Sequence, residues 1–194
     1  PEFLQKAGCD LDSLLYIQAD SVEGVLENIE TLIGTVGKRL FVIWDSIAMT
    51  PSKSDIEGTF DPSETMAVKP RILSKGLSKL VQPIANSESC VLLLNQLRTN
   101  ISNTVPLKYA TEMEKYTFPG GKALLFAIST HIILTMRGAK DSFVLDAHNY
   151  RIGSEVKAKI IKSRFGTLGR EVAFKIVWAD DKHVGVLEND SLFE

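Results

Sequence analysis

Two short polar segments, each directly after an apolar run, carry side chains that could act on a phosphorylated ligand. Asp45 and Ser46 follow the apolar run 40–44, and an amide pair ending in Gln96 follows the run 90–94. Such runs are typical of strands buried on both faces, as in a parallel α/β sheet. An aspartate at a strand's carboxyl end can hold Mg²⁺, and a neutral amide there can bind a phosphate or orient a water. The sequence therefore predicts a site for Mg²⁺ and a nucleotide at these strand ends.

Each candidate also has a simpler interpretation. Asp45 could be an ordinary strand-end aspartate that caps the next loop, and an amide at a strand end is a weak signal on its own. A basic set near the C-terminus most often forms a solvated face of a strand, although it could contact phosphate within the subunit or across a subunit interface. This set consists of Lys157, Lys159, Lys162 and Arg164.

The elements that must position these residues alternate between strand and helix patterns. Apolar residues recur at helical spacing over 22–36, after a capping-box-like Asp20 and Glu23, and over the window 64–85. Strand patterns cover 14–18, the two apolar runs, 131–136, 156–162 and 172–178. Strands alternating with helices, followed by strands alone, predict an α/β fold with a mainly parallel sheet and an antiparallel C-terminal extension.

A polar segment of about twenty residues, 99–118, follows the second candidate strand and ends before Gly120 and Gly121. A loop of that length inside a compact domain is usually functional or disordered. Because it is joined directly to Gln96, contact with a phosphate at one end could change the order of the whole loop.

Length, charge and composition bear on the number of domains, the kind of partner and the cellular location. The chain has 194 residues and a formal net charge of -2, which suits one domain over 1–194 and leaves no global basic field for nucleic acid. Cys9 and Cys90 each sit beside apolar residues, so we expect buried free thiols. No apolar run approaches the roughly 18 residues of a membrane span, and we expect a cytoplasmic protein without a membrane partner.

One motif is missing. A Walker B aspartate implies a Walker A loop, GxxxxGK[ST], and the sequence contains none. The segment 34–38 has glycines and a lysine, but its spacing differs and it follows a helix instead of preceding one. Residues 1–3 could be a cloning scar and the chain starts without methionine, so we expect an engineered or proteolytic fragment.

In this order the segments resemble the RecA recombinase family over nearly the whole chain. The resemblance rests on five segments taken together: 41–58, 92–98 with its Asn-Gln-x-Arg motif, the long gap, the Gly-Gly start at 120–124, and 159–164. The Lys-Ser-Arg variant in the last segment is similar to phage-type recombinases. The resemblance implies a RecA-like P-loop NTPase core, an ATP-dependent recombinase that binds single-stranded and double-stranded DNA, and self-assembly into a filament or ring.

The resemblance also implies an ATP and Mg²⁺ site shared between subunits. Asp45 matches the Walker B acid, and Gln96 matches the residue that senses the γ-phosphate and reports to the DNA loop. Basic and aromatic residues of the C-terminal strands match groups that reach a nucleotide held by the neighbouring subunit or pack near its adenine. The implied nucleotide-binding residues are Asp45, Ser46, Gln96, Lys162, Arg164 and Trp178, with Asp45 and Gln96 also catalytic and Asp45 the metal ligand.

On the DNA side, residues 57–66 match a first DNA-binding loop and 99–118 a second. Aromatic residues of the second loop could stack on unpaired bases, but packing of the loop onto its own domain is an equally good explanation. The implied DNA-binding residues are Met66, Arg71, Arg98, Tyr109, Tyr116, Phe118, Gly120 and Gly121.

Three departures qualify the resemblance. The second loop has near-zero net charge, Ser78 stands where many family members carry an arginine, and the Walker A region with the catalytic glutamate would lie upstream of residue 1. The 194-residue chain should therefore hydrolyse ATP negligibly, although its parent would be a DNA-dependent ATPase. Two rival interpretations are a non-catalytic RecA-like mediator or assembly module and a RecA-fold helicase motor.

Overall fold

The computed structural model describes residues 2–37, 39–59, 61, 63, 67–100, 110, 112–136, 142–166, 168–179 and 184–187. Contacts divide the chain, predicted from sequence to be one domain, into two compact units, and each is described by itself. Unit 1 comprises Pro1–Ile17 and Ser129–Glu194, and unit 2 comprises Gln18–Ile128. Among the helices that the structure describes, none combines the length and apolar character that crossing a bilayer would need.

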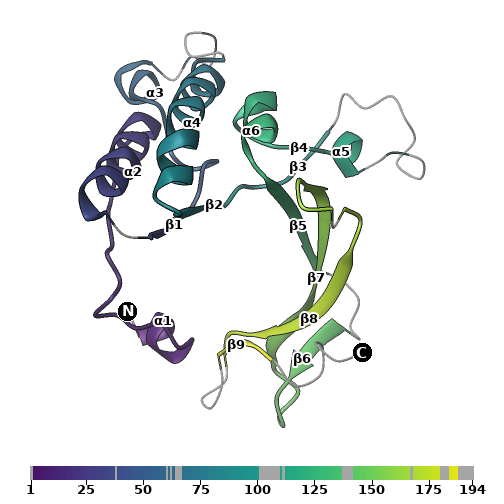
Figure 1. The fold of residues 1–194 in the computed structure, drawn as a ribbon. Coiled ribbons are helices and arrows are strands. Elements are labelled where there is room, and N and C mark those ends of the chain that lie inside the picture. The colour runs from purple at the N-terminus through teal and green to yellow at the C-terminus, as the bar shows by residue number, and fades with distance from the viewer. Residues whose placement is uncertain are drawn as a thin grey trace. The chain divides into compact units, whose positions relative to one another are not determined.

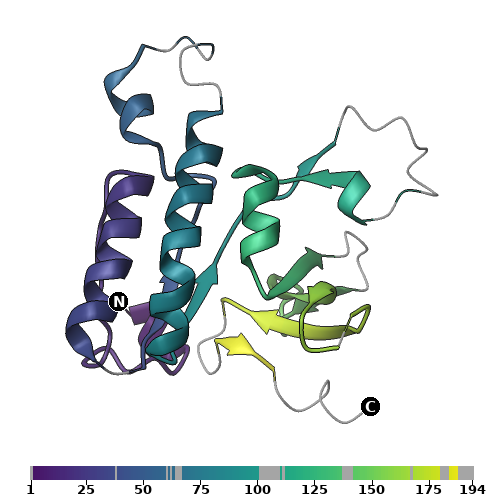
Figure 2. The same cartoon turned by 45° about the horizontal axis from the view of Figure 1, so that its top comes forward.

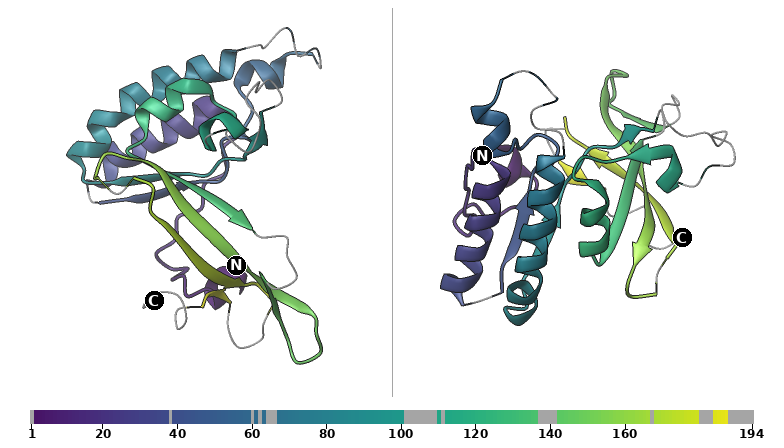
Figure 3. Two further views of the ribbon diagram at one scale, coloured as in Figure 1. Left: turned by 90° about the vertical axis from the view of Figure 1, so that its right-hand side faces the viewer. Right: turned by 90° about the horizontal axis from the view of Figure 1, so that it is seen from above.

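In unit 2, three helices cover one face of a short parallel strand pair (Figure 1 and Figure 3). The helices are α2 (Val22–Val36), α4 (Val68–Asn86) and α6 (Gly121–Ala127), and the strands are β1 (Phe41–Trp44) and β2 (Cys90–Leu93). Shorter elements complete the unit: α3 (Lys53–Glu57), β3 (Arg98–Thr99), α5 (Glu112–Lys115) and β4 (Tyr116–Thr117).

The core of unit 2 forms where the apolar stripes of α2 and α4 meet the inner face of the strands. The two long helices lie side by side in Figure 2, and Leu124 of α6 joins the same cluster. Helix α2 begins at Ser21, whose hydroxyl accepts a hydrogen bond from the Gly24 amide, so the predicted cap at Asp20 is wrong by one residue. The buried members are Val22, Leu26, Ile29, Ile33, Trp44, Ile47, Leu73, Leu77, Leu80 and Leu124.

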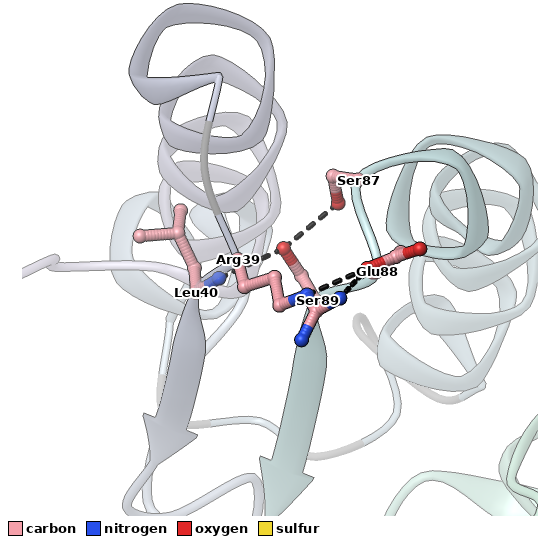
Figure 4. Close-up of polar contacts among 5 residues, drawn as sticks. All are labelled: Arg39, Leu40, Ser87, Glu88 and Ser89. Atoms are coloured by element: carbon pink, nitrogen blue, oxygen red, sulfur yellow. Dashed lines mark hydrogen bonds and ion pairs between the residues drawn. The ribbon is translucent and has the colours of Figure 1, made fainter.

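Polar contacts hold the starts of β1 and β2 together (Figure 4). The Nε of Arg39 donates to Glu88 at 2.6 Å, and the backbone amide of Leu40 donates to the hydroxyl of Ser89 at 3.1 Å. Ser89 also accepts a hydrogen bond from the hydroxyl of Ser87 at 2.8 Å. These contacts lie at the amino ends of the two strands and help to fix their parallel register. In this register Phe41 lies opposite Cys90.

The prediction that these strands are buried on both faces is wrong. Phe41 and Ile43 are 65% and 55% exposed, whereas Trp44 is 4% exposed. Cys90 lies on the exposed side of β2, and Cys9 is exposed beyond α1 (Glu2–Lys6), so the predicted buried thiols are free but exposed. The physical reason is that the described helices of unit 2 cover one face of the pair, and alternate side chains therefore point away from them.

Unit 1 is built on an antiparallel sheet. Its strands are β5 (Thr130–Met136), β6 (Phe143–Leu145), β7 (Arg151–Ser163), β8 (Glu171–Val177) and β9 (Gly185–Val186). The order is β5-β7-β8-β9, with β6 also paired to β7. The long strand β7 is the centre of this sheet in Figure 1.

The α/β class is confirmed, but the expectation of a mainly parallel sheet is not met. Within the described ranges, β1 and β2 form the one parallel pair, and all pairings of the five-stranded sheet are antiparallel. Residues 14–18 are not a strand, because no described strand pairs with them. The segment 99–118 is also more regular than expected, since it contains the last residue of β3 and all of α5 and β4.

Candidate functional site

The parallel pairing of β1 and β2 brings the two polar segments to one edge of unit 2. Trp44 lies opposite Leu93, and the ladder continues past both strands: Leu94 N donates to Trp44 O, and Ile47 N donates to Leu94 O, each at 3.0 Å. Asp45 directly follows Trp44, Gln96 lies two residues after Leu94, and both are exposed. The structure therefore gathers Asp45, Ser46 and Gln96 at the carboxyl ends of adjacent strands.

The chain after Asp45 is held by a compact set of hydrogen bonds. The carbonyl oxygen of Ser46 accepts from both the amide and the hydroxyl of Thr50, at 3.2 and 2.9 Å. The same hydroxyl accepts from the indole Nε1 of buried Trp44 at 2.9 Å. The Asp45–Ser46 peptide is cis. The turn is thus anchored to the core while the Asp45 carboxylate stays exposed.

These residues fit a Mg²⁺ ion that is bound together with a phosphorylated ligand. Mg²⁺ is usually held by one or two carboxylates, with phosphate oxygens and water completing its octahedron. Asp45 supplies one such carboxylate at the strand end, and the part of the chain that the structure describes contains no cluster of three or more metal-binding side chains. These ligands thus suit a cation that binds together with a nucleotide better than a cation held by protein side chains alone.

Asn95 connects this edge to the glycine turn, a role that sequence reasoning missed. Its side-chain Nδ2 donates to the carbonyl oxygen of Pro119 at 2.8 Å, and its Oδ1 accepts from the Gln96 amide at 3.0 Å. Its position in the Asn-Gln-x-Arg motif was the available signal, but only Gln96 and Arg98 were assigned roles from that motif. Asn95 thus links the turn before α6 to the end of β2, the strand that pairs with β1.

Gly120 and Gly121 are required by the backbone at the start of α6. Their φ angles are 104° and 72°, in the region that favours glycine. A Cβ on Gly120 would lie 3.0 Å from Leu73 Cδ1, and one on Gly121 would lie 3.2 Å from Pro70 Cβ. The glycine turn therefore packs directly on the first turns of α4, the helix that carries the exposed Arg71.

The predicted second DNA loop has a defined base. Arg98 pairs with Thr117, and Thr99 pairs with Tyr116, in a short antiparallel ladder. Asn100 extends it, because its backbone amide and its side-chain Nδ2 donate to the carbonyls of Lys115 and Glu114. The structure thus brings the predicted residues Arg98 and Tyr116 together. Tyr116 and Phe118 are half-buried, and Met66 and Tyr109 lie outside the described residues.

Lys69 is a further basic residue at the same end of α4 that the sequence did not single out. Its Nζ donates to the carbonyl oxygen of Ala48 at 3.2 Å. Burial lowers the pKa of Lys69, nearby Asp55 partly offsets the effect, and the charge of Arg98 lowers it further. Lys69 therefore links the turn after Asp45 to the helix that follows the first predicted DNA loop.

The remaining predicted nucleotide residues belong to unit 1, whereas Asp45 and Gln96 belong to unit 2. Lys162 lies near the end of β7, opposite His131, and the Arg164 amide donates to Ser129 O at 3.0 Å. Burial, and secondarily the charge of Lys162, lowers the pKa of His131. Lys157, by contrast, pairs with Glu171 at 2.7 Å, which agrees with its interpretation as part of a solvated face.

Trp178 follows β8 and remains tied to the sheet. Its amide donates to Ile152 O at 2.9 Å, and its side chain is partly exposed. The guanidinium of Arg151 lies 5.3 Å from the centroid of its ring. This arrangement offers part of an aromatic face to solvent.

Comparisons with known proteins agree with the order of these segments. A family model described as the RecA N-terminal domain matches residues 1–182. Among similar curated proteins, Protein RecA of Cereibacter sphaeroides is 32% identical over 180 residues, which are 93% of this chain and 48% of the relative. Protein RecA of Rubrobacter xylanophilus is 29% identical over 194 residues, covering 100% and 51%. Protein RecA of Caulobacter vibrioides is 30% identical, covering 93% and 47%.

The chain spans about half the length of the curated relatives it matches. The match nevertheless includes all the candidate residues of both units described above, from the Asp45 turn to Trp178. The chain therefore belongs to the RecA family.

Proposed function

We propose that the protein is an ATP-dependent recombinase of DNA recombination and repair. It would bind single-stranded DNA, pair it with homologous double-stranded DNA and exchange strands, with ATP and Mg²⁺ as cofactors. One observation carries this proposal: the parallel pair β1–β2 gathers a carboxylate at Asp45 and an amide at Gln96 on one edge. The same edge is hydrogen-bonded through Asn95 to the glycine turn that closes the second loop.

On this proposal the acid and the amide have separate tasks. Asp45 would hold Mg²⁺ and so neutralise charge between the phosphates, and Ser46 lies beside it. Gln96 would contact the γ-phosphate and orient the attacking water, since a neutral amide does so without repelling the phosphate. When bound, the Mg²⁺–ATP complex would supply the energy that separates a DNA-binding from a DNA-releasing state.

The nucleotide would lie between subunits. Lys162 and Arg164 would reach the phosphates of a nucleotide held by the neighbouring subunit, and Trp178 would pack near its base. Basic side chains that contact phosphate form strong charge-assisted hydrogen bonds. The exposed Phe126 of α6 would contribute to the same subunit contact. The partner implied by this arrangement is a second copy of the chain, in a filament or ring.

DNA would bind to the two predicted loops and to the glycine turn. Gly120 and Gly121 form the start of α6, and backbone amides at a helix start suit anions. Arg71 and Arg98 would add charge, and bases would stack on aromatic side chains at about 1–3 kcal/mol each. The proposed DNA-binding residues remain Met66, Arg71, Arg98, Tyr109, Tyr116, Phe118, Gly120 and Gly121.

The 194 residues contain no GxxxxGK[ST] motif. We therefore propose that the purified 194-residue chain turns over ATP negligibly, because amides and a lysine that cradle phosphates are missing from it. DNA-stimulated phosphate release by this chain alone would contradict that statement.

Joint-molecule formation tests the proposed function directly. Full-length protein is mixed with circular single-stranded DNA, homologous linear duplex, ATP and Mg²⁺, and joint molecules are counted on a gel, with heterologous duplex as the control. A recombinase forms joints only with the homologous duplex. Unwinding of a forked duplex without joints would support a helicase motor, and neither activity would support a mediator; both outcomes contradict the proposal.

A further inference from the structure

Three side chains of unit 1 form a cluster that the proposed function leaves unexplained. The guanidinium carbon of Arg151 lies 4.0 Å from the centroid of the Phe143 ring and 5.3 Å from the centroid of the Trp178 ring. Both separations fall within the roughly 6 Å range over which a cation is attracted to an aromatic face. We call Phe143, Arg151 and Trp178 the aromatic clamp.

Hydrogen bonds fix the plane of the guanidinium in this clamp. Arg151 Nη2 donates to the hydroxyl of Ser154 at 3.1 Å, and its Nε donates to the carbonyl oxygen of Gly153 at 3.4 Å. Ser154 is fully buried, and its own hydroxyl donates to Ser142 O at 3.3 Å. Because a planar fork held at two nitrogens cannot rotate freely, the face that it offers to Trp178 has a fixed orientation.

The backbone around the clamp is equally constrained. A Cβ on Gly153 would lie 2.4 Å from the carbonyl oxygen of Ile176, so β7 and β8 approach closely at this point. The amide of Trp178 donates to Ile152 O immediately beyond the last paired residues of β8. The Cα of Trp178 is thus held by the sheet, and the orientation of its ring depends on what packs against it.

Arg151 packs against that ring while leaving part of it accessible. Trp178 is 38% exposed, so one portion of the indole contacts the protein and another remains available. A side chain already held in its bound orientation loses less conformational entropy when a ligand stacks on it. Fixing the ring in advance would therefore raise affinity for a planar ligand without any contact between Arg151 and that ligand.

We propose that Arg151 is a positioning residue that holds the Trp178 indole as a preorganised stacking surface for the base of a nucleotide. This inference rests on the proposed function, which places Trp178 beside the base. It adds a residue to the site and predicts a specific dependence on ligand chemistry. Loss of Arg151 weakens binding of ligands that carry a base and leaves binding of inorganic triphosphate unchanged.

The first experiment needs no nucleotide. Emission of Trp178 is obtained from the 194-residue chain as the difference between the spectra of the parent and of Trp178→Leu, which removes the contribution of Trp44. Arg151→Gln should shift this difference spectrum and increase its quenching by acrylamide, a quencher without charge, because the ring gains mobility and exposure. Arg151→Lys should fall between the two, since it keeps the charge but loses the planar fork. Arg170→Gln, an exposed arginine of the same unit with the same charge change, is the matched control.

The second experiment measures affinity of the full-length protein, in the presence of single-stranded DNA, for a slowly hydrolysed ATP analogue and for inorganic triphosphate. Arg151→Gln should weaken the analogue about two- to fivefold, the size expected for an exposed cation–π contact. The effect should vanish in the Trp178→Leu background, because Arg151 acts only through the indole. Binding of triphosphate should not change in either variant.

The outcomes separate the inference from the function on which it rests. If Arg151→Gln leaves the Trp178 spectrum unchanged, or weakens analogue and triphosphate alike, the positioning role is overturned. If Trp178→Leu itself does not alter affinity for the analogue, the placement of Trp178 beside the base is wrong, and the inference fails with it. An equal loss from Arg151→Gln with and without Trp178 would also overturn it.

Discussion

The side-chain amide of Asn95 donates a hydrogen bond to the carbonyl oxygen of Pro119 at 2.8 Å. The two residues are far apart in the sequence, yet this contact joins the end of β2 to the turn at Gly120. A change at the strand end therefore has a direct route to the segment that closes the second loop.

Replacing Asn95 by alanine should destabilise unit 2 and loosen this route. The variant loses a half-buried hydrogen bond and leaves the Pro119 carbonyl without that donor, so we expect a loss of about 1 kcal/mol in unfolding free energy. Urea titration followed by Trp44 fluorescence in a Trp178→Leu background reports on unit 2. Gln82→Ala is the control, since it removes an exposed side-chain contact to Asn86 at 2.8 Å. An equal effect of the two variants would contradict the assigned role of Asn95.

Two glycine substitutions should change the free energy of unfolding in opposite directions. Gly120→Ala places a Cβ at φ 104° and 3.0 Å from Leu73 Cδ1, so it should cost about 1–3 kcal/mol. Gly34→Ala in α2 has open space around its Cβ and an ordinary helical φ, so it should stabilise by about 0.5–1 kcal/mol. The same urea titration measures both. Stabilisation by Gly120→Ala would show that the turn does not need its left-handed backbone.

The buried serine that begins α3 should matter more than an exposed helical serine. Ser52 is fully buried, and its side chain and the side chain of Asp55 form a reciprocal capping box. Ser52→Ala should therefore cost about 0.5–2 kcal/mol in unfolding free energy. Ser78, whose hydroxyl donates to Ser74 O on the surface of α4, provides the control variant Ser78→Ala, which should be neutral or slightly stabilising. A loss no larger than the control's would refute the cap.

Stability of unit 1 should fall in mildly acidic solution because of His131. Burial, with a smaller effect of Lys162, lowers the pKa of His131 below the 6.5 of an unperturbed imidazole. The unfolded chain then binds the proton more readily than the folded one. The contribution of His131 to stability is therefore complete above pH 6.5 and is lost as pH falls from 6.5 through the lowered folded value.

The check is the urea midpoint of unit 1, followed by Trp178 fluorescence in a Trp44→Phe background, at a series of pH values. His131→Gln should remove this part of the pH dependence, whereas His148→Gln in an exposed turn should leave it in place. Identical pH profiles for the parent and His131→Gln would rule out the assigned cause.

Local patterns predicted the elements of this protein better than its surfaces. The apolar run before Asp45 identified β1, and the helical spacing over 22–36 identified α2, because both depend on neighbouring residues in sequence. The same run gave a wrong prediction of burial. Phe41 and Ile43 were expected in the core but are exposed, since the described helices of unit 2 cover the opposite face of the pair. Periodicity cannot reveal how many faces of a strand are covered.

The residues of the candidate site were likewise predicted only in part from the sequence. Asp45 and Gln96 could be chosen from residue type and strand position, and the parallel register then brought them to one edge. The motif marked Asn95 but not its partner Pro119, and nothing in the sequence marked the Lys69–Ala48 contact, because each contact joins segments more than twenty residues apart. The aromatic clamp was missed for the same reason, since Arg151 and Trp178 meet only when β7 and β8 pair.

The central claim is that the edge carrying Asp45 and Gln96 senses a nucleotide and controls DNA binding. The most direct measurement compares the affinity of full-length protein for fluorescent single-stranded DNA with and without a slowly hydrolysed ATP analogue, in the parent and in Gln96→Ala. We predict that the analogue raises the affinity of the parent strongly and that Gln96→Ala loses most of this increase while retaining its affinity without nucleotide. An undiminished increase in Gln96→Ala would contradict the account.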